Sequence, residues 1–86
     1  MTSIIAVFVH HDGDFIASQP NGEGDPPVLL RSHRPNATSG PKVVIWQLRL
    51  KVAANGKVYA AYSARHLPVP ADEDVRKAIF KAASRI

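Results

Sequence analysis

The fold is decided by residues 42–65, which read KVVIWQLRLKVAANGKVYAAYSAR. In the first half of this stretch the even positions are apolar, and the odd positions from 47 on are polar. The apolar residues are Val44, Trp46, Leu48, Leu50 and Val52, and the polar residues are Gln47, Arg49 and Lys51. An alternation with a period of two is typical of a strand with one buried face and one wet face. We therefore predict a strand over residues 42–52 whose Trp46 side faces the core.

The dipeptide Asn55-Gly56 predicts a hairpin turn, with residues 57–65 returning as the antiparallel partner strand. A two-residue turn sets Lys51 opposite Ala60 and Arg49 opposite Tyr62. A three-residue turn with a bulge sets Lys51 opposite Tyr59 instead. Either register places a tyrosine beside a base on the polar face of the hairpin.

Downstream, the spacing of apolar residues changes from strand to helix. One helical stripe holds Val75, Ile79, Ala82 and Ile86, and another holds Lys77, Lys81 and Arg85. Pro70 suits the first helical turn, and the acids at 72–74 favour the positive end of the helix dipole. We predict a C-terminal helix that packs on the Trp46 and Leu48 face, with Ile79 against Trp46.

Upstream, residues 3–9 predict another strand, and the Asp12-Gly13 turn leads into a partner strand at residues 15–18. The first strand is apolar at both parities, so both of its faces need cover. One helix covers only one face of a sheet. We predict that a second copy of the chain covers the other, as a homodimer; the alternative is cover by Val28, Leu29 and Leu30 of the chain's own loop.

Residues 19–41 hold five of the seven prolines and three of the five glycines, and they predict a long loop interrupted by a short strand at residues 28–31. The whole chain, residues 1–86, is expected to be one domain. The predicted fold class is α+β: an antiparallel sheet of four or five strands with one C-terminal helix packed on one face.

Charge is segregated along the chain. Residues 1–25 contain four acids and no Lys or Arg, whereas residues 26–71 contain no acid and seven bases: Arg31, Arg34, Lys42, Arg49, Lys51, Lys57 and Arg65. A block of one sign points to an anionic partner, either a nucleic acid or an acidic protein. The plain alternative is that these bases only keep a small sheet in solution.

The function predicted from these features is a small, non-enzymatic nucleic-acid-binding module that favours single strands. Tyrosines on a basic sheet face can stack bases while Lys and Arg neutralise phosphates. The predicted contact residues are Arg49, Lys51, Tyr59, Tyr62, Arg31, Arg34, Lys57 and Arg65. The alternative is a protein-interaction module, a regulator or inhibitor that binds its partner through an edge strand or the helix.

No motif of a known catalytic class is present, and we expect no cofactor. A metal site is conceivable at His10, His11, Asp12 and Asp14, which carry imidazole and carboxylate ligands. However, neighbouring strand residues point to opposite faces, and an Asp-Gly turn already explains the segment. We therefore predict no metal. The absence of cysteine and of an apolar leader predicts a cytoplasmic protein.

Overall fold

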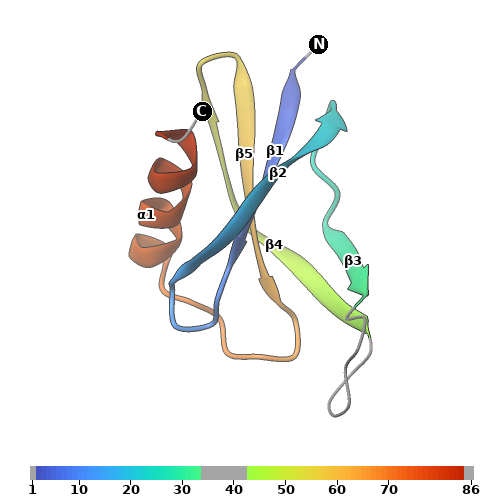
Figure 1. Ribbon diagram of the computed structural model, residues 1–86, viewed down its shortest axis with the longest axis vertical. Coiled ribbons are helices and arrows are strands. Elements are labelled where there is room, and N and C mark those ends of the chain that lie inside the picture. Colours follow the sequence, from blue (N-terminus) through green and yellow to red (C-terminus); the bar gives the residue numbers. More distant parts are fainter. Residues whose placement is uncertain (1, 34–42, 85–86) are drawn as a thin grey trace.

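The computed structural model describes residues 2–33 and 43–84, which form a mixed five-stranded sheet and a C-terminal helix (Figure 1). The elements are β1 (Ser3–Val9), β2 (Phe15–Glu23), β3 (Leu29–His33), β4 (Val43–Ala54), β5 (Lys57–Ala64) and α1 (Asp72–Ala83). The predicted α+β class is confirmed. No helix in these two ranges is long and apolar enough to cross a membrane. Four residues considered above lie outside the described residues: Arg34, Lys42, Arg85 and Ile86.

The sheet is mixed, so the prediction of a purely antiparallel sheet is wrong. Its strand order is β2-β1-β5-β4-β3, and the central pair, β1 and β5, is parallel, with Ser3 beside Lys57 and Val9 beside Ser63. The other three pairs are antiparallel. A central strand is covered on both faces, which accounts for the apolar residues at both parities of β1.

Two strands occupy parts of the segment that the sequence predicted as a loop. β2 continues through Pro20 to Glu23, five residues past its predicted end, and β3 pairs with β4 from Leu29 to His33. Pro20 is tolerated because β2 is an edge strand, where a residue without an N–H group need not break the sheet. The predicted loop is therefore wrong for residues 19–23, and the short strand predicted at 28–31 is present but begins one residue later, at Leu29. Residues 34–41 of the predicted loop lie outside the described residues.

The Asn55-Gly56 turn is confirmed as a two-residue turn. Both residues have positive φ, 54° and 75°, as the twist of a tight hairpin requires. Lys51 pairs with Ala60, the register expected for the two-residue turn rather than the pairing with Tyr59.

A β-bulge at Arg49 interrupts the ladder between β4 and β5. Leu48 pairs with Tyr62 and Leu50 pairs with Ala61, so two steps along β4 match one step along β5. The extra residue is Arg49, and it moves every later side chain of β4 to the opposite face from the one that simple alternation predicts.

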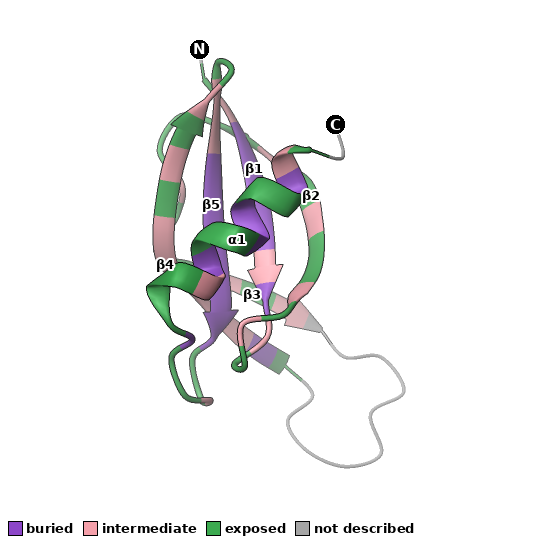
Figure 2. Ribbon diagram, turned by 90° about the vertical axis from the view of Figure 1, so that its left-hand side faces the viewer, coloured by how far each residue is buried: buried purple, intermediate pink, exposed green. Residues whose placement is uncertain are grey.

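The side of the sheet that α1 covers, here called the helix face, holds the larger core (Figure 2). The strands contribute buried residues from β1 and β5, and α1 contributes its apolar stripe, while Leu50 and Val52 of β4 pack at the edge. The buried set is Ile5, Val7, Val9, Tyr59, Ala61, Val75, Ala78, Ile79 and Ala82.

Trp46 and Leu48 lie on the other side of the sheet, the inner face, so the prediction that the helix packs on them is wrong. They precede the bulge, and they pack with a second buried cluster of Ile4, Ala6, Ala60 and Tyr62. The ring of Phe8 meets that of Trp46 edge-on, with 5.0 Å between the centroids. Ile79 belongs to the helix-face core and has no part in this cluster.

The sheet curls over its inner face and covers it. Edge strands β2 and β3 both border one hollow there, whose lining includes Ile16 of β2 and Ser32 of β3. The hydroxyl of Tyr62 donates a hydrogen bond of 2.7 Å to the carbonyl of Pro27 in the connection between these strands. Leu30 packs on the inner cluster, as the single-chain alternative expects, whereas Val28 and Leu29 are exposed. Dimerisation stays a prediction. Its basis in the sequence is a face of the sheet that lacks cover, whereas in the structure the chain itself covers the inner face.

Tyr62 should make stability sensitive to alkaline pH. Burial raises the pKa of its phenol above the ordinary value of 10.0, so the contribution is present below that pH and is lost as the pH rises through the folded-state pKa. Tyr62→Phe removes the hydrogen bond, and we expect the variant to lose about 1 kcal/mol of unfolding free energy at pH 8. Between pH 8 and pH 11 the variant should lose less stability than the parent, because it has no phenol to ionise at position 62. Urea unfolding at both pH values measures this. Equal pH dependence in the two proteins would contradict it.

Candidate functional site

The predicted face of bases and tyrosines does not form. Tyr59 points into the helix-face core and Tyr62 into the inner cluster, with 2% and 0% of their surfaces exposed. Neither ring is free to stack on a base. The bulge also separates the two bases: Lys51 pairs with Ala60 of the inner face, whereas Arg49 bonds to Ser63 on the helix face. The expected neighbours therefore lie on opposite sides of the sheet.

Lys57 lies beside the Asn55-Gly56 turn, at the start of β5. Arg65 follows the other end of that strand, eight residues later, so their Cα atoms are about 26 Å apart at the usual rise per residue of a strand. Lys51 pairs with Ala60, five residues before Arg65, so its Cα is about 17 Å from that of Arg65, and its side chain lies on the inner face. These two lysines belong to one end of the sheet and Arg65 to the other.

Three of the predicted arginines are brought together. Arg31 of β3 pairs with Ile45 of β4, and the backbone N–H of Arg65 donates to the carbonyl of Ile45 on the other side, at 2.8 Å. Residues paired across neighbouring strands share a face, so Arg31 and Arg65 flank Ile45 in one row. With strands about 4.8 Å apart, their Cα atoms are about 10 Å apart.

Arg49 joins this row through its hydrogen bond. Its Nε donates to the hydroxyl of Ser63 at 2.7 Å, and Ser63 lies two residues before Arg65 on the same side of the chain. Arg49 lies on the same side of β4 as Ile45 and as Gln47, which pairs with Ser63, whereas the bulge turns the later residue Lys51 to the other face. We call Arg31, Arg49 and Arg65 the arginine cluster.

The helix leaves the β3 end of this face open. Among the described residues α1 contacts β1, β2, β4 and β5 but not β3. Figure 1 shows α1 at the left and β3 at the right, with the other strands between them. Arg31 and Arg65 are exposed, and Arg49 is half-buried. The two ion pairs found within residues 2–33 and 43–84 join His10 to Asp12 and Lys77 to Glu73. No acid in that part of the chain neutralises the arginine cluster.

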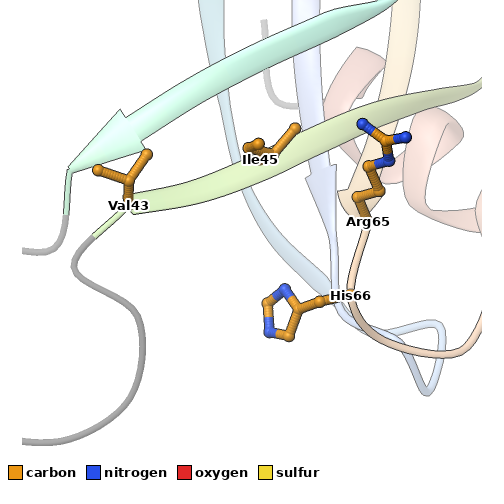
Figure 3. A pocket seen from close by; sticks show the side chains of 4 residues that line it. All are labelled: Val43, Ile45, Arg65 and His66. Carbon is orange, nitrogen blue, oxygen red and sulfur yellow. The ribbon is translucent and has the colours of Figure 1, made fainter.

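A hollow of about 490 Å³ adjoins the cluster, lined by Val43, Ile45, Arg65 and His66. Val43, Ile45 and Arg65 follow one another along one side of it, and the imidazole of His66 stands across from them (Figure 3). Val43 is 39% exposed although it is apolar. This hollow combines an apolar wall with a guanidinium and an imidazole.

Three of the lining residues were not singled out in the sequence: Val43, Ile45 and His66. The available signal was that Val43 and Ile45 share the parity of Gln47 and Arg49, the side predicted to be wet. Two large apolar residues on a wet face are a reason to expect a contact surface there.

His10 and Asp12, at the start of the first turn, interact within the turn itself. Asp12 accepts a hydrogen bond from the backbone N–H of Asp14 at 3.0 Å, which lowers the pKa of the Asp12 carboxyl, and His10 lies 3.0 Å from the same carboxylate. Across the described ranges, no group of three or more His, Cys, Asp or Glu residues is arranged to hold a metal ion.

Comparisons of the chain with protein-family models, with curated proteins and with solved structures gave no match.

Proposed function

We propose that the protein is a small nucleic-acid-binding module whose arginine cluster contacts the phosphate backbone. The observation that supports this most directly is that Arg31, Arg49 and Arg65 lie together on the part of the helix face that α1 leaves open, and that no acid in the described part of the chain forms an ion pair with them. A guanidinium stays charged at all physiological pH values and matches two phosphate oxygens at once. The proposed role is binding, without a chemical step.

The backbone that carries the cluster is held in place, and so is the side chain of Arg49, which favours a defined contact over a diffuse charge. Arg31 and Arg65 project from paired backbone on either side of Ile45, and the hydrogen bond to Ser63 orients Arg49. Side chains that are already ordered lose less conformational freedom when they bind a ligand. The net charge of +4 adds a long-range attraction to any polyanion.

Replacing Arg31 and Arg65 together by alanine should weaken binding to a labelled oligonucleotide. Each lost phosphate contact removes about 0.7 to 0.9 from the slope of log affinity against log salt, so the double variant should lose about 1.4 to 1.8 from that slope. Fluorescence anisotropy over a salt series measures both the affinity and the slope. Both side chains are exposed, and we expect the fold to be retained.

The matched control is Lys51→Ala with Lys57→Ala, which removes the same charge from the hairpin end of the sheet. It should keep most of the affinity and of the salt slope if position matters and net charge alone does not. Equal losses in the two double variants, or no loss for the arginine pair, would contradict the proposed site.

A second candidate function is binding of a partner protein through the edge of β3. The observation that favours it is that β3 ends the sheet, while Val28 and Leu29 beside that edge are 65% and 44% exposed. An added strand gains its affinity from backbone hydrogen bonds and from pockets for alternate side chains. Such a contact should respond little to salt, so the same salt series separates the two functions.

A further inference from the structure

The hollow beside the arginine cluster offers a nucleic acid something that phosphate contacts alone do not use. Arg65 belongs both to the cluster and to the lining of the hollow, and Ile45 lies between Arg31 and Arg65. A ligand that meets the guanidinium with an anionic group therefore has the apolar wall of Val43 and Ile45 beside it. Its chemistry must combine a negative charge with a flat and largely apolar body within a few ångströms. A nucleotide has both parts.

We infer that the hollow of Val43, Ile45, Arg65 and His66 seats one unpaired base of a single strand, whose neighbouring phosphate is bound by the arginine cluster. This inference rests on the proposed function and specifies its ligand. The hollow's volume of about 490 Å³ leaves room for a base. The imidazole of His66 and the guanidinium of Arg65 are planar groups on which a base can stack.

Duplex DNA fits the same surface less well. Its bases are paired and stacked inside, so it presents phosphates to the arginines and leaves Val43 and Ile45 facing a charged backbone. A single strand turns a base outward without breaking a pair, and that base removes the exposed apolar wall from water. The buried positions of Tyr59 and Tyr62 leave this hollow as the stacking surface that adjoins the arginines.

The test compares a labelled 12-nucleotide single strand with the duplex of the same sequence, at one salt concentration, for the parent protein and for Ile45→Thr with His66→Ala. We expect the parent to bind the single strand more tightly than the duplex. The double variant should lose about tenfold in single-strand affinity, the scale of one lost stacking contact, and keep its duplex affinity. Threonine keeps the β-branched shape at position 45, and His66 is exposed, so folding should be preserved.

Two controls make the test specific to the hollow. Ile16→Thr is the same substitution at a half-exposed residue of β2 that lines the hollow of the inner face, and it should leave both affinities unchanged. His66→Ala alone should give part of the single-strand loss, so the inference stays testable if the double variant does not fold.

The outcomes separate this inference from the proposed function. The inference of a seated base is overturned if the parent binds both ligands equally and the hollow variants have no effect. The proposed function survives that result if Arg31→Ala with Arg65→Ala still weakens both complexes. Equal loss of single-strand and duplex binding in the folded hollow variants would also overturn it. If the parent protein binds neither oligonucleotide, the proposed function fails and the inference fails with it.

Discussion

Replacing Trp46 by alanine should lower the free energy of unfolding by about 3 to 5 kcal/mol. The indole packs with the inner cluster, meets Phe8 edge-on at 5.0 Å, and donates from Nε1 to the hydroxyl of Ser32 at 2.7 Å. Alanine removes the packing and the hydrogen bond and widens the hollow between β2 and β3, which Trp46 lines. Urea unfolding followed by circular dichroism measures the loss.

Two further variants divide that loss into its parts. Trp46→Phe keeps an aromatic ring beside Phe8 and loses the hydrogen bond, and Ser32→Ala removes only the acceptor of that bond. Each should cost about 1 to 2 kcal/mol, well below the alanine variant. A loss under 1 kcal/mol for Trp46→Ala would contradict the inner cluster as a second core of the protein.

The second large effect is expected at Gly13, in the turn between β1 and β2. Its φ is +98°, and a Cβ atom added there would lie 2.5 Å from the Cβ of Asp74 in the first turn of α1. Gly13→Ala therefore combines a strained backbone with a collision that pushes the helix from the turn. We expect a loss of about 2 to 5 kcal/mol in the free energy of unfolding.

Gly24 supplies the matched control for the Gly13 variant. Its φ of +96° is nearly the same, but within the described ranges nothing except its own chain neighbours lies within 4 Å of an added Cβ. Gly24→Ala should cost only the backbone part, about 1 to 2 kcal/mol. Thermal or urea unfolding of the two variants side by side isolates the contact between the turn and the helix. Equal losses would show that Asp74 moves aside freely.

The elements that the sequence predicts well are those whose signals are local. The Asn55-Gly56 turn needs two residues that accept positive φ, and both stand next to each other in the chain. The helix needs a stripe of apolar residues with acids before it, and Val75, Ile79 and Ala82 are indeed its buried side. The local pattern of β1 shows that both of its faces are covered, but it does not show that its parallel partner is β5, because that strand lies far along the chain.

The bulge at Arg49 explains why the burial of β4 could not be predicted. Apolar residues continue at even positions on both sides of it, so the sequence pattern is unbroken while the face changes: Leu48 belongs to the inner cluster, and Leu50 packs on the helix-face core. Alternation shows that a strand has two kinds of position. It does not show which neighbours cover each kind, because α1 and the curled sheet both provide apolar cover.

The candidate site was predicted in part. Arg31, Arg49 and Arg65 were each singled out for their charge, but bringing them together required β3 to pair with β4 and Arg65 to lie beside Ile45, and charge alone shows neither. Tyr59 and Tyr62 were predicted on a wet face, and both are buried because β5 lies in the middle of the sheet, with cover on both sides. Lys51 and Lys57 remain at the other end of the sheet.

The parallel pairing of β1 with β5 also sets the order in which the chain can fold. Ser3 lies beside Lys57, so β1 can pair with β2 at once but has to wait for its second partner, which is 54 positions further along the chain. At a synthesis rate of about 5 to 20 residues per second, that delay is roughly 3 to 11 seconds. The hairpin of β4 and β5, closed by a two-residue turn, needs only microseconds once it has been made. During synthesis, β1 therefore stays without its parallel partner, and its open edge and apolar residues are exposed to aggregation until the hairpin of β4 and β5 has formed.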